Sequence, residues 1–208
     1  MTKKKSKKAR ALAAISRLEK LFPAAKCGLN YKNEFELLVA VQLSAQCTDA
    51  RVNAIAPKLF SRVKNWRDLA EIPEIELQKL IFSTGFYRQK ARNLQKAARQ
   101  ILEKFDGKLP RKMADLTKLS GVGRKTANVL LQTLFGVVEG IVVDTHVARI
   151  SRKLGLTREK DPIKIERDLM KIIPKTKWAA VGNLFVFYGR NVEPARKKGI
   201  FPLSDLYV

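Results

Sequence analysis

Apolar residues recur at three- and four-residue spacing through most of the chain, which is the period of a helix with one buried face. The segments with this pattern are 35–46, 49–60, 75–85, 87–105, 111–119, 124–135, 145–155 and 161–173. The last of them opens with Asp161 as a cap and Pro162 at the first helical position, an order that helix starts prefer. Only residues 140–144, "GIVVD", look strand-like, and they are too isolated to build a sheet. The pattern predicts an all-α fold.

The linkers between these segments are short and no fixed-period repeat is present, which predicts closely packed helices. Residues 1–10, "MTKKKSKKAR", are the only low-complexity segment. We expect them to form a basic disordered tail. Such a tail is either simply solvated or a nonspecific tether to DNA.

The charge of the chain indicates a polyanionic partner. The 208 residues carry a net charge of +23, and +17 remains without the first ten residues. A surplus of this size destabilises a compact state unless a polyanion binds it. Nucleic acid is the leading partner, with counterion release supplying much of the affinity. Charge alone does not separate this interpretation from packing of a ribosomal or chromatin type.

No apolar run approaches the roughly 18 residues of a membrane span, and the N-terminus lacks signal-peptide character. We therefore expect an intracellular protein. The two cysteines, Cys27 and Cys47, form no metal-ligand pattern and suggest no disulfide framework. We interpret them as buried or idle thiols in a reducing compartment.

A glycine-containing turn joins two predicted helices in "LSGVGRKTA", residues 119–127. Gly121 and Gly123 permit positive φ and close approach of a ligand to the backbone, while Val122 between them is expected to point inward. The amides of such a turn, followed by a helix N-terminus and Arg124, form a ready anion site. A bare "GVG" is more typical of an ordinary helix–helix turn.

The whole string is more specific than its glycines, because "LSGVGRKTA" resembles the helix-hairpin-helix signature. "VVDTH" follows after about twenty residues, and "FELLVAVQLSAQCTDARVN" and "GFYRQKARNL" precede it. Together these motifs resemble the endonuclease III family of DNA glycosylases, over about residues 16–190. The resemblance implies a central helical barrel over 26–138 and a second helical subdomain from 11–25 plus 139–208. It places DNA in a cleft between the two.

Relatives with lysine at the hairpin position are bifunctional, and Lys125 occupies that position. The resemblance implies that its amine attacks C1′ of a damaged nucleotide, expels the base and leaves a Schiff base for β-elimination. Attack needs the neutral amine, which a helix N-terminus, adjacent Arg124 and partial burial would favour. A surface lysine that contacts phosphate is the structural alternative.

Asp144 in "VVDTH" matches the catalytic carboxylate of the family. Its implied role is to stabilise positive charge at C1′ and to help the lysine lose a proton. Asp144 also has the place of an N-cap for the helix that follows, and the two roles are compatible. His146, the only histidine, is expected to support local structure, while Arg149 and Arg152 either reach phosphates or are solvated.

A base inside a duplex cannot reach Lys125, so its nucleotide must be extruded and the gap filled. Gln46 matches the family residue that enters the vacated space. Phe86 stands where relatives place a wedging aliphatic residue, although a core position is the alternative. Asp49 either lines the base pocket or caps the helix that begins there.

Most relatives end in four cysteines that hold a [4Fe–4S] cluster, whereas residues 188–208 of this chain contain none. Such a cluster needs thiolate ligands. We therefore expect no iron–sulfur cluster and no metal. Apolar residues would pack the tail instead, namely Ile200, Phe201, Leu203, Leu206 and Tyr207. The run of Arg196, Lys197 and Lys198 would contact phosphate.

The resemblance thus predicts a glycosylase and AP lyase that acts on oxidised pyrimidines in duplex DNA, as a monomer. We place it in the cytoplasm with the nucleoid of a prokaryote, or in the nucleus of a eukaryote. A noncatalytic helix-hairpin-helix DNA-binding protein is one alternative, but it would need neither Lys125 nor Asp144. A mismatch-specific glycosylase is another, but such relatives usually carry serine or tyrosine at the lysine position.

Overall fold

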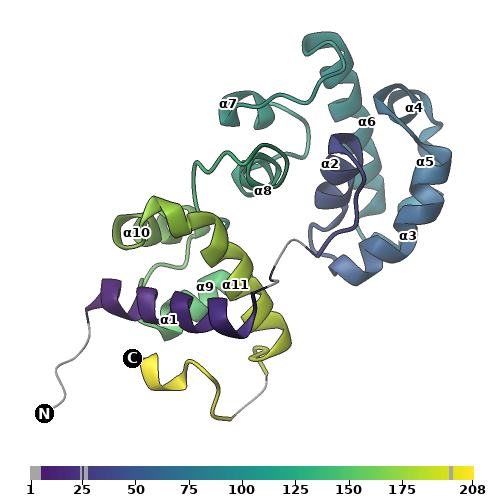
Figure 1. Ribbon diagram of the computed structural model, residues 1–208. Helices are drawn as coiled ribbons and strands as arrows, with labels where there is room; N and C mark the ends of the chain where they lie inside the picture. The colour runs from purple at the N-terminus through teal and green to yellow at the C-terminus, as the bar shows by residue number, and fades with distance from the viewer. Residues whose placement is uncertain (1–5, 24, 26–27, 197–198) are drawn as a thin grey trace, which may run out of the picture. The chain divides into compact units, whose positions relative to one another are not determined.

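The computed structural model describes residues 6–23, 25, 28–196 and 199–208, and all regular structure among them is helical (Figure 1). This confirms the all-α prediction, and residues 140–144 form no strand. The chain divides into two compact units, Gly28–Val137 and the combination of Met1–Cys27 with Val138–Val208. No helix in the described part of the chain is both long and apolar enough to cross a membrane.

The unit Gly28–Val137 is built around a helix that is buried on nearly all sides. This helix, α2, is mostly apolar and eight of its ten residues are buried, as expected of a helix in a core. Three of its neighbours, α3, α6 and α8, pack directly against it. The helices of the unit are α2 (Glu34–Leu43), α3 (Asp49–Arg62), α4 (Trp66–Glu71), α5 (Glu74–Ile81), η1 (Phe82–Thr84), α6 (Tyr87–Lys104), α7 (Met113–Leu116) and α8 (Arg124–Phe135).

Helix α6 supplies hydrogen bonds to the ends of other helices as well as an apolar face. Gln95 Nε2 donates to the carbonyl of Ile72 across 2.6 Å, and Arg99 donates to the carbonyl of Ala70 across 3.2 Å. Both carbonyls lie at the C-terminal end of α4, where the last carbonyls have no partner within the helix. Some polar side chains of α6 therefore stabilise the end of α4, while others face solvent.

The second unit packs five helical segments and the C-terminal residues around one apolar core. Helix α11 contacts both α1 and α9, and Gly189 allows the approach to α9 because a Cβ there would meet Cβ of His146 at 2.9 Å. The segments are α1 (Lys7–Leu21), α9 (Thr145–Lys153), α10 (Pro162–Ile172), η2 (Lys175–Lys177) and α11 (Trp178–Asn191), followed by η3 (Ser204–Leu206).

The predicted disordered tail over residues 1–10 is wrong for its second half. Helix α1 already begins at Lys7, because the Ser6 side chain caps it by accepting from Ala9 N. Arg10 is buried, and its guanidinium donates to the carbonyls of Leu154 and Gly155 across 2.8 and 3.2 Å. Residues 1–5 lie outside the described part of the chain.

Candidate functional site

The glycine hairpin turns sharply between α7 and α8, as its sequence predicts. Val122 is 4% exposed and its amide donates to the carbonyl of Leu119, so it points inward as expected. Gly121 has φ +74°, and a Cβ there would come within 3.0 Å of Gln42 Oε1. Glycine is therefore required at this position for both its backbone angle and its lack of a side chain.

Side-chain amides of α2 and α6, which the sequence pattern did not single out, hydrogen-bond to Ser120 of the hairpin. Gln42 Nε2 donates to the carbonyl of Ser120 across 3.0 Å, and the amide of Ser120 donates to Gln100 Oε1 across 2.8 Å. The Ser120 hydroxyl donates to Asn93 Oδ1 across 3.1 Å. These bonds tie the hairpin to α2 and α6, which fixes the backbone that a phosphate would contact.

Helix α8 begins directly after the hairpin with an open N-terminus. Its N-cap is Gly123, which offers no side-chain oxygen, and nothing lies within 4 Å of where a Cβ of Gly123 would be. Arg124 and Lys125 are the first two residues of the helix and both are exposed. The expectation of partial burial at Lys125 is wrong, because the first turn of α8 points this side chain away from the core. The positive end of the helix dipole and the open backbone remain at the lysine.

Asp144 is the N-cap of α9, as the sequence predicted. Its Oδ1 accepts from the amides of His146 and Val147 across 2.8 and 2.9 Å. These bonds hold the carboxylate in one orientation, and its other oxygen has no partner among these amides. His146 lies against Gly189 of α11, which agrees with a structural role for the histidine.

Arg149 does not fit its predicted role in DNA binding. Its Nη2 donates to the carbonyl of Gly189 across 2.9 Å and to that of Glu193 across 2.5 Å, at the C-terminal end of α11. Only 17% of its side chain is exposed. The guanidinium is occupied inside its own unit because it satisfies the last carbonyls of a helix.

Gln46 and Phe86, the two predicted gap-filling residues, share an uncommon backbone conformation. Their φ angles are +52° and +48°, and the described residues include just one other non-glycine residue with positive φ, Asp106. Phe86 is 65% exposed, so the alternative of a core residue is wrong. A bulky residue in the left-handed region is strained, and such strain clusters at functional sites.

Asp49 does not cap α3, because the Thr48 side chain accepts from the amide of Arg51 and makes Thr48 the cap. Asp49 is the first residue of the helix, and its carboxylate lies so close to Gly28 that a Cβ there would meet Oδ2 at 2.8 Å. Its expected alternative, a place in the base pocket, therefore remains a prediction. Cys47 is a free, half-buried thiol, while Cys27 lies outside the described residues.

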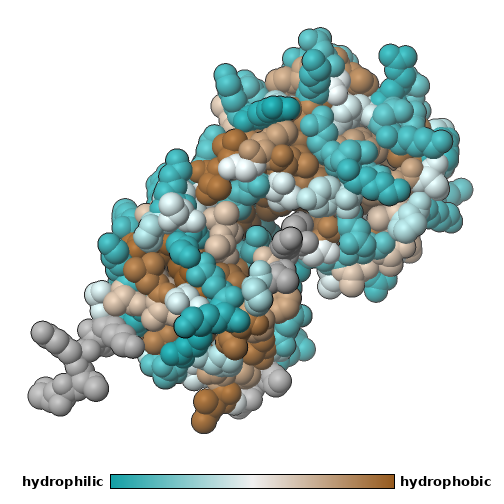
Figure 2. All heavy atoms as spheres, viewed as in Figure 1, coloured by the Kyte–Doolittle hydropathy of each residue, from teal (hydrophilic) through white to brown (hydrophobic). Residues whose placement is uncertain are grey.

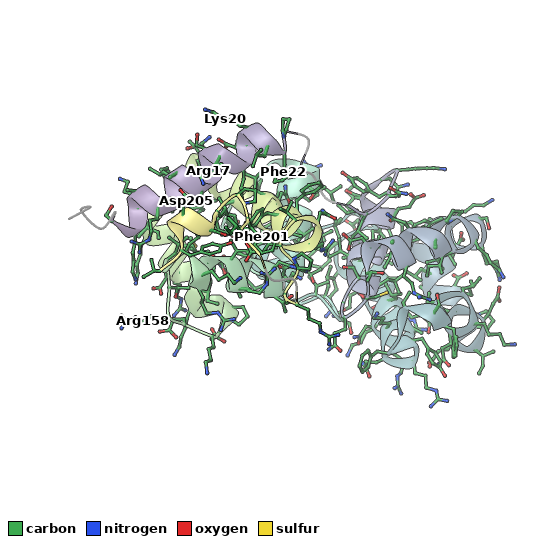
Figure 3. The ribbon with its side chains drawn as sticks, turned by 90° about the horizontal axis from the view of Figure 1, so that it is seen from below. Arg17, Lys20, Phe22, Arg158, Phe201 and Asp205 are labelled. Atoms are coloured by element: carbon green, nitrogen blue, oxygen red, sulfur yellow. The ribbon has the colours of Figure 1, made fainter. Side chains whose placement is uncertain are left out.

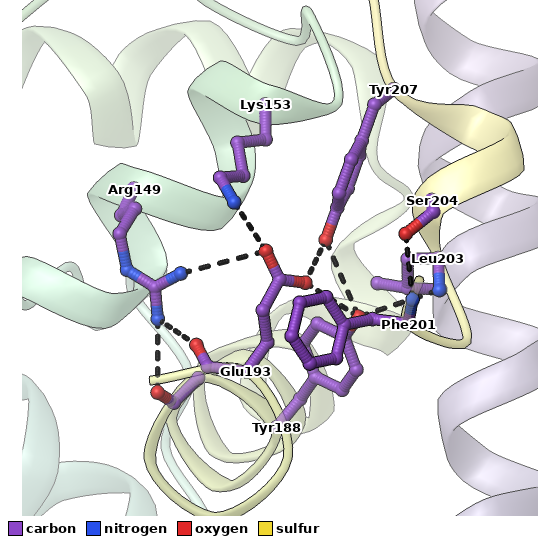
Figure 4. A network of polar contacts seen from close by, with 9 residues as sticks. Arg149, Lys153, Tyr188, Glu193, Phe201, Leu203, Ser204 and Tyr207 are labelled. Atoms are coloured by element: carbon purple, nitrogen blue, oxygen red, sulfur yellow. Dashed lines mark hydrogen bonds and ion pairs between the residues drawn. The ribbon is translucent and has the colours of Figure 1, made fainter. Parts of the chain in front are cut away.

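The C-terminal segment, which contains no cysteine, is anchored by a buried carboxylate. The Glu193 side chain is fully buried and contacts Lys153, Arg149 and the hydroxyls of Tyr188 and Tyr207 (Figure 4). Burial opposes its ionisation, but hydrogen bonds from Lys153, Tyr207 and Tyr188 outweigh burial and lower the pKa of Glu193. Burial also raises the pKa of Tyr188 to about 12. The phenols therefore stay protonated and donate to an ionised Glu193.

The apolar residues expected to pack the tail do so with one exception. Leu203 and Leu206 are buried, and Phe201 and Tyr207 pack against the same core. Ile200 is 95% exposed, so its predicted burial is wrong. Arg17 of α1 holds the segment through Asp205 and the carbonyl of Pro202 (Figure 3). In the predicted basic run, Arg196 is exposed, and Lys197 and Lys198 lie outside the described residues.

Comparison with known proteins gives the same family as the site residues. Residues 39–175 match the HhH-GPD superfamily base excision DNA repair protein family. The chain is 50% identical over 197 residues to Endonuclease III of Synechocystis sp., which covers 95% of this chain and 90% of the relative. It is 46% identical over 177 residues to Endonuclease III of Bacillus subtilis, covering 85% of this chain and 80% of the relative. The chain belongs to the endonuclease III family.

Solved structures of the endonuclease III family carry the same fold. A non-covalent Endonuclease III–DNA complex matches with a TM-score of 0.92 and 43% identity, covering 96% of this chain and 94% of that chain. A trapped Endonuclease III–DNA covalent intermediate matches with a TM-score of 0.88 and 44% identity, covering 91% and 89%. As a member of this family, the chain is a DNA glycosylase with AP-lyase activity in base excision repair.

Proposed function

We propose that the protein excises oxidised pyrimidines from duplex DNA, and that Lys125 is the nucleophile for both excision and strand cleavage. The observation that carries the assignment is the exposed position of Lys125 in the first turn of α8, directly behind the glycine hairpin. A phosphate held by the hairpin amides and the helix N-terminus would present the sugar beside this amine. A trapped covalent intermediate is known for a relative that is 44% identical.

Attack of the Lys125 amine on C1′ of the damaged nucleotide accounts for both base excision and strand cleavage. The neutral Lys125 amine forms a bond to C1′ as the glycosidic bond breaks, and the electron pair leaves with the base, which takes up a proton. Opening of the sugar ring gives a protonated Schiff base. Loss of a proton from C2′ then expels the 3′ phosphate by β-elimination, and water releases the lysine. The iminium is the electron sink that makes the elimination feasible.

Asp144 supplies negative charge where the sugar becomes positive. A carboxylate that two backbone amides already hold needs no reorganisation during the reaction, which is the condition for electrostatic stabilisation. Its second role is to accept a proton from the attacking amine. The N-cap therefore serves as scaffold and catalyst together.

Gln46 and Phe86 are proposed to fill the gap that the extruded nucleotide leaves. Both side chains are exposed on positive-φ residues, which is the arrangement expected of groups that enter a duplex. The net charge of +23 supports affinity for the phosphate backbone. Hydrophilic side chains spread over both units on the face seen in Figure 2. We propose that a monomer acts on the nucleoid of a bacterial cytoplasm, since the relatives compared are bacterial.

We also propose that this family member works without an iron–sulfur cluster. The 208 residues include two cysteines, both in the first 47, so residues 48–208 offer no thiolate. Within the described residues, no group of three or more His, Cys, Asp and Glu side chains is placed to hold a metal ion. The ion pairs and phenols around Glu193, together with Leu203 and Leu206, would hold the tail instead.

Borohydride trapping on an abasic-site duplex tests the proposal. Wild-type protein should give a covalent adduct, and Lys125→Gln should give none while its affinity for lesion DNA stays within about threefold. Lys112→Gln removes another exposed lysine of the same unit and should trap like wild type. A trapped adduct with Lys125→Gln would assign the chemistry to another amine. If the wild type gives no adduct, the protein is a noncatalytic DNA-binding protein. Base excision from duplexes that contain either a mispair or an oxidised pyrimidine then separates a mismatch-specific glycosylase from the proposed one.

A further inference from the structure

Lys90 is a buried lysine near the start of α6, a helix that otherwise displays its charges to solvent. Its residue is 7% exposed, and its Nζ donates to the carbonyl of Leu43 and to the carbonyl of Thr84, each across 2.8 Å. No carboxylate among the described residues pairs with it. Burying an ammonium group is costly, so two short bonds to carbonyls must be what retains it.

The two acceptors are the ends of two different helical segments. Leu43 is the last residue of α2, and Thr84 is the last residue of η1. The C-terminal carbonyls of a helix lack partners within the helix and carry its negative partial charge, which suits a cation. Lys90 is therefore a single ammonium group that caps two chain segments and joins them. Burial lowers the pKa of Lys90, and the nearby Cys47 opposes this shift.

Each of these segments leads directly to one of the positive-φ residues described above. Gln46 follows Leu43 by three residues, and Phe86 follows Thr84 by two. Lys90 itself is four residues beyond Phe86, and its amide donates to the carbonyl of Phe86. The loops that carry Gln46 and Phe86 are thus both held by hydrogen bonds to one buried atom, Nζ of Lys90.

We infer that Lys90 is a positioning residue that holds Gln46 and Phe86 at a fixed separation, so that they enter the duplex as one unit. The inference rests on the proposed function of these two residues. Without the shared ammonium group, each loop keeps its own turn, but the distance between the two loops is no longer fixed. A displacement of about 1 Å in a positioning group can cost on the order of a hundredfold in rate. Lys90 touches no substrate in this scheme and acts through the two loops alone.

Lys90→Met tests this because methionine keeps most of the stem and fills the buried space without a donor. We expect excision of an oxidised pyrimidine from a duplex to fall by about ten- to a hundredfold. Cleavage at a preformed abasic site should stay within about threefold, because an abasic nucleotide costs less to extrude. Adding Phe86→Ala and Gln46→Ala to Lys90→Met should cause little further loss, since Lys90 acts through these residues.

Gln95→Met is the matched structural control. Gln95 is also a buried residue of α6, and its Nε2 also donates to a carbonyl at a helix end, but that carbonyl belongs to Ile72. This variant should lose stability without changing the ratio of excision to abasic cleavage. Equal losses on both substrates with Lys90→Met, or full additivity with the Gln46 and Phe86 variants, would overturn the inference.

Two further measurements separate the possible failures. If Lys90→Met does not fold, Lys90→Gln replaces it, because its shorter side chain cannot bridge both carbonyls, and an unchanged substrate ratio would refute the positioning role. If the wild type excises no lesion, the proposed function fails on its own. Fluorescence of 2-aminopurine placed beside an abasic site then reads the positioning directly. Binding should raise it for wild type and not for Lys90→Met, and an equal rise in both would contradict the inference.

Discussion

The hydroxyl of Tyr188 donates a hydrogen bond to Glu193 Oε2 across 2.7 Å, where α11 gives way to the C-terminal segment. The same carboxylate receives Lys153 and lies beside Arg149, and both of these residues belong to α9. Since Asp144 is the N-cap of α9, the tail is anchored to the helix that carries the proposed catalytic carboxylate. The anchor is ionic and phenolic, so we expect its stability to depend on substitution and on pH.

Glu193→Gln should destabilise the protein by about 2–4 kcal/mol. The change removes the anion of this cluster, which is costly at the largely buried Arg149 and less so at Lys153, whose side chain is 43% exposed. Urea unfolding followed by circular dichroism measures the effect. Glu139→Gln, an exposed carboxylate in the same unit, should change stability by less than about 0.5 kcal/mol. A similar stability for both variants would mean that the network contributes little.

Acid should weaken the same anchor. The folded-state pKa of Glu193 is lowered, so its contribution to stability is complete above the ordinary glutamate pKa of 4.5 and is lost as pH falls through the folded value. Unfolding free energies measured from pH 7 downward should therefore decline below about pH 4.5 more steeply in the wild type than in Glu193→Gln. Parallel pH profiles for the two proteins would show that other carboxylates dominate the acid response.

The positive φ of Phe86 predicts that glycine at this position is more stabilising than alanine. Phe86→Gly should be more stable than Phe86→Ala by about 1 kcal/mol, because only glycine adopts positive φ without cost. In an ordinary helix the order would be reversed. Thermal unfolding of the two variants measures the difference. Alanine equal to or better than glycine would show that the left-handed conformation is not kept. Both variants should lose lesion excision more than abasic cleavage.

The two hairpin glycines should respond differently to alanine. Gly121→Ala should cost about 1–3 kcal/mol of stability, because φ is +74° and the new Cβ would crowd Gln42 and Asn93. Gly123 has φ −88° and open space around it, so Gly123→Ala should fold normally and instead weaken DNA binding. Denaturation and duplex affinity, measured on both variants, check the contrast. Loss of stability at Gly123 would remove the case for a backbone surface kept open for phosphate.

Much of the fold follows from local pattern. Helix positions depend on spacing within a few residues, and caps depend on neighbours within one turn, so Asp144 and Asp161 could both be recognised as caps. Ser6 follows the same rule, but a run of lysines around it resembled a disordered tail. The fold class and the hairpin were therefore predictable, while the start of α1 was not.

The buried charges could not be predicted because their partners are distant in sequence. Lys90 bonds Leu43, which is 47 residues away, and in a basic helix a lysine is normally solvated. Arg149 bonds Glu193, 44 residues away, so its sequence neighbours suggested a phosphate contact instead. Periodicity predicts which face of a helix is buried, but not which charged group on that face finds a carbonyl.

Asp144 permits the capping role and the catalytic role to be separated by substitution. Asp144→Asn keeps an oxygen that can accept from the amides of His146 and Val147, and asparagine caps about as well as aspartate. Stability should therefore change by less than about 0.5 kcal/mol, while excision slows by roughly two to four decades because the negative charge is gone. Asp144→Ser should behave alike, since serine also caps.

Asp144→Ala completes the series because it loses the cap and the charge together. It should unfold more easily, by about 1 kcal/mol, but be no slower than Asp144→Asn once both are fully folded. Single-turnover excision and urea unfolding, measured on the same preparations, give the excision rate and the free energy of unfolding of each variant. If Asp144→Asn retains the wild-type excision rate while Asp144→Ala loses it, the carboxylate only caps the helix, and the charge that assists departure of the base must come from another residue.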